Sequence, residues 1–401
     1  MSLADKLEAF AKAGEVAVAP DRQRPQHPAG WEPGVVWNGR EGAVTSAPMV
    51  ERPKDWNDLL RIWDLDPTVY EVVEPVQFRA WDAAIGEGNV QRLHYYRATI
   101  RTRRHGGVDV DELVASIGRH KPRKLVTHTG ARVFVYPIGD MQAGKPDGDG
   151  TAGTVQRVLE SLDIHVERYR QLRKQGVTNG TVYLPWLGDC IEGTVSQGGQ
   201  LAAAGRLDLT LTEQVRVVRR LMLAQVQAFA PYADTIIVPV VPGNHDEAFR
   251  AGSVQRRYDD SWAIEAASSV ADALALNPEA FGHVRFVFPD KDEWLITLDV
   301  AGTVVTFAHG HQWRGEAASA HKWWAGQAHG MQPAGDSTLL LCAHRHHLYV
   351  QTAGAKTVLQ IPAMDGGSTW WRHSTGQHAP AASLSLTVGG GTWADLHVTA
   401  A

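Results

Sequence analysis

Cysteine is scarce in this chain of 401 residues, which contains only Cys190 and Cys342. Two cysteines cannot form the disulfide framework of a small secreted protein. They fit a protein of a reducing compartment, so we expect a cytoplasmic location and no disulfide-linked partner. Both thiols lie beside polar motifs, but small buried thiols pack well, and we assign them no catalytic role.

Long apolar runs are also missing. No apolar stretch approaches the ~18 residues that identify a membrane-spanning helix. The N-terminal segment MSLADKLEAFAKAGE carries charges throughout and lacks the apolar core of a secretory signal. The apolar fraction of 44% is nevertheless ordinary for a globular protein with a sizeable core. We therefore expect a soluble protein without a membrane partner.

The chain has no excess of positive charge. Lys and Arg number 39 against 44 Asp and Glu, which gives a net charge of −5. This balance is not typical of a protein that coats nucleic acid electrostatically. It does not exclude a nuclease, because bound divalent cations would reverse the sign of the charge locally.

The first 125 residues differ from the rest in sequence pattern. A charged helical start precedes a Pro/Gly-rich stretch, Pro20 to Gly42, which is typical of a loop or linker. Apolar spacing then predicts a short helix around residues 59–63, ended by Asp66-Pro67, and strands over 70–73 and 94–102. We predict a small α+β accessory module over residues 1–125 and a catalytic domain over 126–401.

From Arg132 onward the pattern becomes α/β. Residues 131–138 form a short apolar run typical of a strand buried on both faces. Helical spacing follows up to Gly176, and Thr210 with Glu213 forms a capping box for a helix that ends near Phe229. The other predicted elements are strands over 181–189 and 234–246, a helix over 258–274, and strands over 283–288, 293–300, 303–310, 338–347, 347–353, 356–363 and a last pair within 382–398.

Five short polar segments lie at the ends of these predicted strands. They are Gly139-Asp140-Met141-Gln142, Gly188-Asp189, Gly243-Asn244-His245-Asp246, His309-Gly310-His311 and His344-Arg345-His346. In an open α/β sheet, ligands collect at the carboxyl ends of the strands. Carboxylates, amide oxygens and imidazoles suit Mn²⁺, Fe or Zn²⁺, and the segments offer enough donors for two ions that share one carboxylate.

Each segment alone is a weak signal. A Gly-Asp after a strand is usually a turn, and a lone His beside a Gly is more often a solvated or core histidine than a ligand. The segment Asn244-His245-Asp246 is stronger, because such residues at a strand end have little packing value. An HxH pair on a strand would place His344 and His346 on one face. The order of all five segments argues against a purely structural set.

In order and spacing, the segments resemble the calcineurin-like metallophosphoesterase superfamily over about residues 130–350. Its pattern is D-x-H, GD, GNH(D/E), H and GHxH, each after a strand. The resemblance implies a four-layer α/β/β/α sandwich, here with the small N-terminal α+β module. The chain also resembles phage-type members described as DNA repair exonucleases, for which the location would be the host cytoplasm.

The resemblance further implies two metal sites that share the carboxylate of Asp189. The first metal would be held by Asp140, Gln142, Asp189 and His346. The second would be held by Asp189, Asn244, His309 and His344. His245 would be the catalytic histidine. His311 is an alternative to His309, which we prefer because it ends the predicted strand.

Two positions depart from the family pattern. Gln142 stands where most members have His, and its neutral amide oxygen favours a hard ion, so we expect Mn²⁺, with Fe, Zn²⁺ or Ni²⁺ as alternatives. A Gln there resembles some nucleotide-diphosphate hydrolases of the superfamily as well as its phage-encoded members. Ala343 replaces the usual Gly before the HxH pair, and it is small enough that we expect no loss of the site.

This set of residues suits phosphodiester hydrolysis. Two cations roughly 4 Å apart acidify a bridging water, which attacks as hydroxide, and neutralise charge on the phosphoryl oxygens. His245 would stabilise the transition state or protonate the departing oxygen. Asp246 or Glu247 would orient its imidazole. Arg345 would alternate to the opposite face of a strand, so we interpret it as structural.

Two features bear on the substrate. Lys145 lies in the glycine-rich loop 143–150 and is a candidate phosphate contact, with a flexible surface turn as the equal alternative. A basic strip with Tyr95 and Tyr96 could guide a nucleic-acid backbone, although a solvated face near a domain junction carries equal weight. Its cationic residues are Arg92, Arg97, Arg101, Arg103, Arg104, Arg119, Lys121, Arg123 and Lys124.

We carry three functional hypotheses. The first is a metal-dependent phosphodiesterase acting on DNA, exonuclease-like, with the N-terminal module positioning the substrate. The second is a small-nucleotide phosphodiesterase or pyrophosphatase, supported by Gln142 and the acidic balance. The third is a non-catalytic scaffold of the same fold, against which the intact ligand set argues. The sequence indicates neither the polarity of cleavage nor the oligomeric state.

Overall fold

A computed structural model describes most of the chain. The described residues are 30–37, 41–86, 89–102, 110–121, 130–195, 205–251, 254–255, 257–315, 318–367, 372–373, 376 and 378–400. They form two compact units, Met1–His105 and Gly106–Ala401. The helical start expected at the N-terminus lies outside the described residues, as does the first half of the Pro/Gly-rich stretch.

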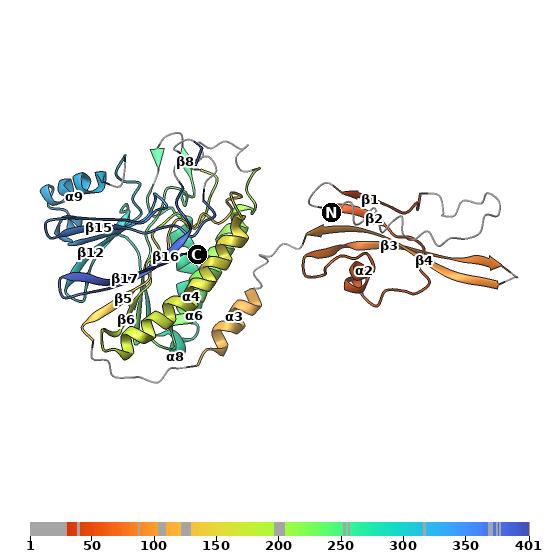
Figure 1. Cartoon of the computed structure of the whole chain (residues 1–401), viewed down its shortest axis with the longest axis horizontal. Helices are drawn as coiled ribbons and strands as arrows, with labels where there is room; N and C mark the ends of the chain where they lie inside the picture. Colours follow the sequence, from red (N-terminus) through yellow and green to blue (C-terminus); the bar gives the residue numbers. More distant parts are fainter. Residues whose placement is uncertain are drawn as a thin grey trace. The chain divides into compact units, whose positions relative to one another are not determined.

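The described residues of the first unit form a four-stranded antiparallel sheet and one short helix (Figure 1). The sheet order is β1 (Gly34–Trp37), β2 (Glu41–Thr45), β4 (Asn89–Thr102) and β3 (Tyr70–Gly86). Helix α2 (Trp56–Ile62) begins at Asp55, whose carboxylate accepts from the backbone N–H of Asp58. Its Leu59 and Leu60 pack with Val44 and Ile100 in one core cluster. The helix and strands predicted here are confirmed.

One expectation for this unit is wrong. The stretch up to Gly42 was expected to be a loop or linker, but Val35 and Val36 pair with Val44 and Ala43 across β1 and β2. Pairing with a neighbouring strand supplies the hydrogen bonds that the local Pro/Gly content does not predict.

The second unit contains a six-stranded sheet. Its order is β10 (Val284–Val287), β7 (Thr235–Pro239), β6 (Thr178–Tyr183), β5 (Arg132–Val135), β16 (Ala382–Gly389) and β17 (Thr392–Ala400). The first four strands are parallel, and β16 and β17 are antiparallel additions. Alternate side chains of β5 belong to different cores, since Phe134 lies in the first cluster and Val133 and Val135 lie in the second.

Three long helices and the shorter α3 (Val110–Arg119) and α8 (Pro278–Phe281) share the first core cluster with this sheet. The long helices are α4 (Gly150–Lys174), α6 (Leu211–Phe229) and α7 (Trp262–Ala275). Tyr169 of α4 and Phe229 of α6 both lie against the ring of Phe134. The predicted capping box is present at the start of α6, where the backbone N–H of Thr210 donates to Glu213 at 2.8 Å. Shorter elements are β8 (Arg250–Ala251) and β9 (Val254–Gln255).

A five-stranded sheet completes the unit. Its order is β11 (Leu295–Val300), β12 (Thr303–Ala308), β13 (Leu339–Cys342), β15 (Lys356–Gln360) and β14 (Tyr349–Ala353). The second core cluster joins this sheet to the first, as Tyr183 and Phe307 stack with ring centroids 6.4 Å apart. Trp324 of α9 (Ser319–His329) packs on Leu340 and Val358 in another cluster. Helix α10 (Pro333–Asp336) follows α9.

The mixed α/β class predicted from the sequence is confirmed, with several sheets. Strands β12, β13 and β15 are mutually parallel, like β5, β6 and β7 of the other sheet. No helix in the described part of the chain combines the length and apolarity needed to cross a membrane. Cys190 and Cys342 are both buried as free thiols.

Candidate metal centre

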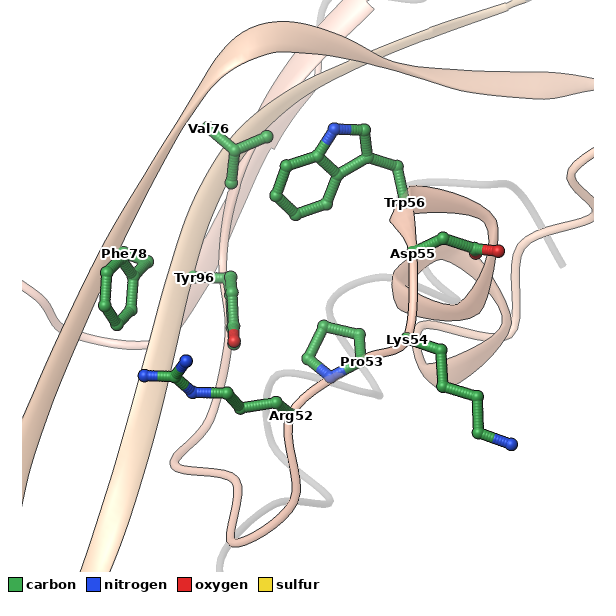
Figure 2. A pocket seen from close by; sticks show the side chains of 8 residues that line it. All are labelled: Arg52, Pro53, Lys54, Asp55, Trp56, Val76, Phe78 and Tyr96. Carbon is green, nitrogen blue, oxygen red and sulfur yellow. The ribbon is translucent and has the colours of Figure 1, made fainter.

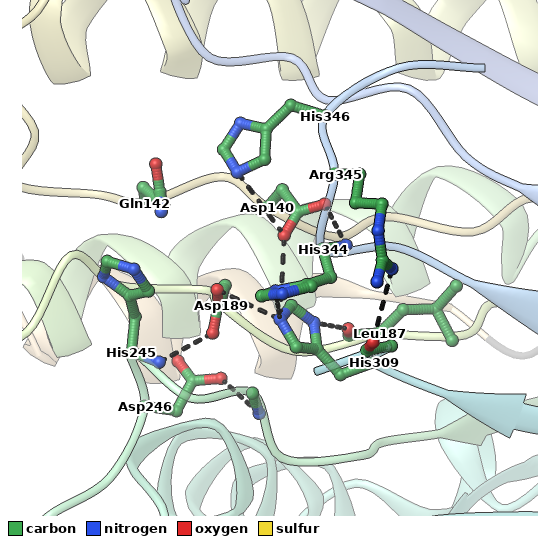
Figure 3. Close-up of polar contacts among 12 residues, drawn as sticks. Asp140, Gln142, Leu187, Asp189, His245, Asp246, His309, His344, Arg345 and His346 are labelled. Atoms are coloured by element: carbon green, nitrogen blue, oxygen red, sulfur yellow. Dashed lines mark hydrogen bonds and ion pairs between the residues drawn. The ribbon is translucent and has the colours of Figure 1, made fainter. Parts of the chain in front are cut away.

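The five polar segments, although spread over some two hundred positions, converge on one place (Figure 3). Asp140, Asp189 and Asn244 follow the parallel strands β5, β6 and β7, while His309 and His344 follow β12 and β13. Both sheets therefore present the carboxyl ends of parallel strands at the same site, as the edge rule for α/β sheets predicts.

The tightest part of the site is formed by Asp189, His309 and His344, whose candidate ligand atoms all lie within 4.8 Å of one another. The Nε2 atom of His309 lies 3.0 Å from Asp189 Oδ2 and 3.1 Å from His344 Nδ1. The other ring nitrogen of His309 donates to the carbonyl of Leu187 at 2.7 Å. That hydrogen bond fixes the ring with Nε2 toward the cluster, as a backbone carbonyl behind a metal-bound histidine does.

Asp140 connects this cluster to His346. Its Oδ1 atom lies 3.8 Å from His346 Nε2 and 3.9 Å from His309 Nε2. Its Oδ2 atom accepts from the backbone N–H of His344 at 2.6 Å. The carboxylate is thus oriented by the backbone, with one oxygen directed between two imidazoles.

The predicted ligands share an unusual backbone conformation. Ten described residues other than glycine have a positive φ, and five of these are predicted ligands. Those five are Asp140 (φ 50°), Gln142 (42°), Asp189 (48°), His344 (79°) and His346 (57°). Such conformations cost energy and concentrate at functional sites, where the surrounding structure holds them.

Two glycines allow the loops after β6 and β7 to meet. A Cβ atom on Gly243 would lie 2.1 Å from both the backbone nitrogen and Oδ1 of Asp189. Gly188 has a φ of +81°, and a Cβ there would lie 2.6 Å from the backbone nitrogen of Gly243. Only glycine permits this approach, which positions the Asp189 carboxylate.

Two buried oxygens of the predicted ligands have no hydrogen-bond partner: Asp140 Oδ1 and Asn244 Oδ1. An unsatisfied buried acceptor is costly, and for a carboxylate oxygen the cost is larger still. A divalent cation would satisfy both oxygens, and carboxylate, amide and imidazole donors are ligands of such ions. The residues present therefore fit a metal.

Burial and neighbouring charges shift the pKa values of the inner residues. Burial raises the pKa of Asp140, whereas the imidazoles of His309 and His245 outweigh burial and lower the pKa of Asp189. Burial would lower the pKa of His309, but the carboxylates of Asp189 and Asp140 raise it to about 9. Burial and His309 together lower the pKa of His344 to about 2. A bound metal ion would supply the positive charge that the carboxylates of Asp189 and Asp140 otherwise favour on His309.

His245 is half-buried beside the cluster. Its backbone N–H donates to Asp189 Oδ1 at 2.7 Å, and its Nδ1 lies 2.9 Å from the carbonyl oxygen of Glu192. The carboxylate of Glu192 also lies 3.5 Å from Nδ1. Glu192 thus orients the imidazole, a role that no sequence motif indicated.

Asp246 was expected, as an alternative to Glu247, to orient His245, but its carboxylate binds the backbone instead. Its carboxylate accepts from the backbone N–H groups of Cys190, Ile191 and Gly243, at 2.9, 3.2 and 3.1 Å. It therefore joins the loop after β6 to the loop after β7. The expectation that it orients His245 is wrong, because both of its oxygens bind the backbone. Burial and the nearby Asp189 raise its pKa to about 7.

A second acid missed by sequence reasoning is Asp365, which follows β15. Its Oδ1 lies 3.3 Å from His346 Nδ1, and its Oδ2 forms an ion pair with Lys145 Nζ at 2.5 Å. Lys145 also donates to Gln142 Oε1 at 2.9 Å. Burial opposes ionisation of Asp365, but His346 and Lys145 outweigh it and lower its pKa. Burial alone would lower the pKa of His346, but Asp140 and Asp365 outweigh burial and raise it.

The expected geometry of the HxH pair is wrong. Strand β13 ends at Cys342, and His344 and His346 follow in a bend with positive φ, so they do not share a strand face. Arg345 between them donates to the carbonyls of Trp313 and Gly315 at 3.0 and 2.7 Å. Its structural interpretation agrees with these contacts, although the reason is a bend held by carbonyls rather than strand alternation.

His311 lies next to the cluster but outside it. Its ring stacks on Trp294, with centroids 4.8 Å apart and planes at 11°. Its centroid is 5.3 Å from that of His309. The cluster of candidate ligand atoms contains His309.

Two described cations of the basic strip form ion pairs. On β4, Arg92 lies 3.5 Å from Asp82, and Arg101 forms an ion pair with Glu71 at 2.5 Å. Arg97 donates to Thr45 Oγ1 at 3.1 Å. The residues Arg103, Arg104, Arg123 and Lys124 lie outside the described residues.

No protein-family model matches the chain, and no curated protein matches it. Among solved structures, a predicted phosphoesterase from Streptococcus pneumoniae is 13% identical, with a TM-score of 0.30 over 67% of this chain and 90% of that one. An archaeal phosphodiesterase is 11% identical, with a TM-score of 0.31 over 66% and 99%. Vps29 from Entamoeba histolytica, solved with Zn²⁺, is 12% identical, with a TM-score of 0.29 over 67% and 98%. These are the solved structures that the chain is similar to, and the family resemblance itself rests on the order and spacing of the motifs.

Proposed function

We propose that this protein is a two-metal-dependent phosphodiester hydrolase. The observation that carries the proposal is that two buried oxygens of proposed ligands, Asp140 Oδ1 and Asn244 Oδ1, have no hydrogen-bond partner. A cation beside each would satisfy both oxygens. The first would be held by Asp140, Gln142, Asp189 and His346. The second would be held by Asp189, Asn244, His309 and His344.

The architecture proposed with it is the four-layer α/β/β/α sandwich of the family. It is supported by the core cluster that joins the two sheets, and by the separate clusters that join helices to each sheet. In this arrangement the site lies where the loops of both sheets meet.

Bound divalent ions would supply an activated water and charge neutralisation at the phosphoryl group. The protein's own residues prepare the site for that chemistry. Asp189 is held by Gly188 and Gly243, and its Oδ1 accepts from the backbone of His245. Glu192 binds Nδ1 of His245, which leaves Nε2 as the ring atom to stabilise the transition state or donate a proton to the leaving oxygen.

DNA is the proposed substrate, cleaved in an exonuclease-like manner, and Mn²⁺ is the proposed ion because Gln142 offers a hard oxygen ligand. Lys145 would reach a substrate phosphate only by leaving Gln142 and Asp365. A cytoplasmic location is proposed with this function. A second candidate, hydrolysis of a small nucleotide, is favoured by the pairing of Arg92 and Arg101 with acids, which neutralises part of the basic strip.

The test is hydrolysis in Mn²⁺ of bis(p-nitrophenyl) phosphate, single- and double-stranded DNA, cyclic dinucleotides and ADP-ribose. Asp189→Asn is expected to abolish turnover with the fold retained, and His245→Ala to reduce it by about 10²- to 10⁴-fold. His329→Ala is the matched control, because His329 is exposed at the end of α9. Equal activity in Asp189→Asn and wild type would refute the proposal. A stable protein inert toward every substrate would favour the scaffold hypothesis.

A further inference from the structure

The first unit contains a cavity that the proposed hydrolysis does not use. It has a volume of about 420 Å³ and lies between strands β3 and β4 and the segment leading into α2 (Figure 2). The cavity is lined by Arg52 and Pro53 of that segment, by Trp56 at the start of α2, by Phe78 of β3 and by Tyr96 of β4.

Aromatic rings dominate the walls of the cavity. Phe78 is 55% exposed and Trp56 38% exposed, so part of each ring is open to a ligand. The ring of Phe78 stacks on Tyr96, with centroids 6.1 Å apart. Trp56 is oriented by Glu74, which accepts from its indole N–H at 2.6 Å. These rings are therefore held in place before any ligand arrives.

A cation accompanies the rings. The guanidinium of Arg52 lies over the ring of Phe78, 5.2 Å from its centroid. The positive charge also acts on His94. Burial lowers the pKa of His94, and Arg52 and Arg92 lower it as well. The acid in the wall, Asp55, is bound to the start of α2 and its side chain points away from the rings in Figure 2.

We propose that this cavity binds a nucleotide of single-stranded nucleic acid. The base would pack against the exposed parts of the Phe78 and Trp56 rings, and the Arg52 guanidinium would pair with a flanking phosphate. Aromatic faces accept any base, so binding would be tolerant of sequence. A duplex is disfavoured because its base faces are already covered by stacking. A proline-rich peptide would pack against the aromatic rings but would leave Arg52 without a counter-charge.

This inference rests on the proposed action on DNA and extends it to a positioning site in the first unit. The experiment measures the fluorescence anisotropy of a labelled single-stranded oligothymidine with the full-length chain in EDTA, where hydrolysis is blocked. Phe78→Ala and Arg52→Gln are each expected to weaken binding about 5- to 100-fold. Phe78→Tyr keeps a ring and is expected to retain affinity. Val36→Ala is the control, since Val36 is 75% exposed on β1 of the same unit.

Equal affinity of wild type, Phe78→Ala and Arg52→Gln would overturn the proposal, as would absence of oligonucleotide binding by the wild type. Preference for a duplex, or displacement of the oligonucleotide by a proline-rich peptide with higher affinity, would also overturn it. Hydrolysis of bis(p-nitrophenyl) phosphate in Mn²⁺ is measured on the same variants. Phe78→Ala is expected to retain that activity, so failure of this site is distinguishable from failure of the metal centre.

Discussion

Asp365 offers a sharp test of how the first metal site is held, because it contacts a proposed ligand without being one. Its Oδ1 faces Nδ1 of His346, and Nε2 of the same ring faces Asp140. A carboxylate behind a metal-binding imidazole fixes the ring and raises its basicity. In Asp365→Asn, the amide oxygen can still face His346, but the negative charge is lost, and an amide N–H₂ meets the ammonium of Lys145.

The expected magnitude follows from this position. Loss of an outer carboxylate typically weakens metal binding by about 10- to 100-fold, or about 1.4–2.7 kcal/mol. The carboxylate is 5% exposed and Lys145 11% exposed, so solvent screens the change only weakly. Asp365 contacts His346 and Lys145, whereas the second site is built on Asp189, His309 and His344, so that second site serves as the internal reference.

The assay is isothermal titration of the metal-free protein with Mn²⁺, supported by metal analysis after dialysis. Asp365→Asn is expected to weaken one of two binding steps and to leave the other within about twofold. Asp149→Asn is the matched control, because Asp149 lies on the neighbouring loop and pairs with Arg157 rather than with a proposed ligand. Unchanged binding in Asp365→Asn, or an equal loss in Asp149→Asn, would refute the reasoning.

Two further predictions concern the loops and the core. Gly243→Ala would place a Cβ 2.1 Å from Asp189 Oδ1, so we expect about 1–3 kcal/mol of destabilisation and loss of Mn²⁺ binding; Gly118→Ala, which meets nothing within 4 Å, should retain binding. Buried His165 lies between Ser383 and Ser385 with its pKa lowered to about 3, so it is neutral when folded and protonates on unfolding. Its contribution is complete above pH 6.5 and is lost as the pH falls toward 3, by about 2 kcal/mol at pH 5. Urea unfolding of His165→Gln should show a correspondingly shallower pH dependence, and an identical slope would contradict this account.

Much of the second unit could be predicted because its strands are buried on both faces. Short apolar runs bounded by Gly and polar residues, such as those of β5, β7 and β13, are typical of buried strands. The ligand candidates then follow, since the carboxyl ends of parallel strands must meet at one edge. The capping box of Thr210 and Glu213 is equally local, and it is present in the structure.

Other features depend on tertiary contacts that no local pattern reports. Asp365 lies in a loop without a motif, and only folding brings it to His346 and Lys145. Glu192 similarly reaches His245 because the loops after β6 and β7 interlock at Gly188 and Gly243. Sequence alternation also missed the bend after β13, because positive φ at a histidine is imposed by its surroundings. The missed residues are thus those that position the predicted ones.

The central claim is that Asp189 lies between two divalent ions. The most direct measurement is anomalous X-ray diffraction from crystals of the Mn²⁺-loaded protein. We predict two peaks, separated by roughly 3.5–4 Å, with the Asp189 carboxylate contacting both and Asn244 contacting only one. A single peak, or two peaks that do not share Asp189, would contradict it.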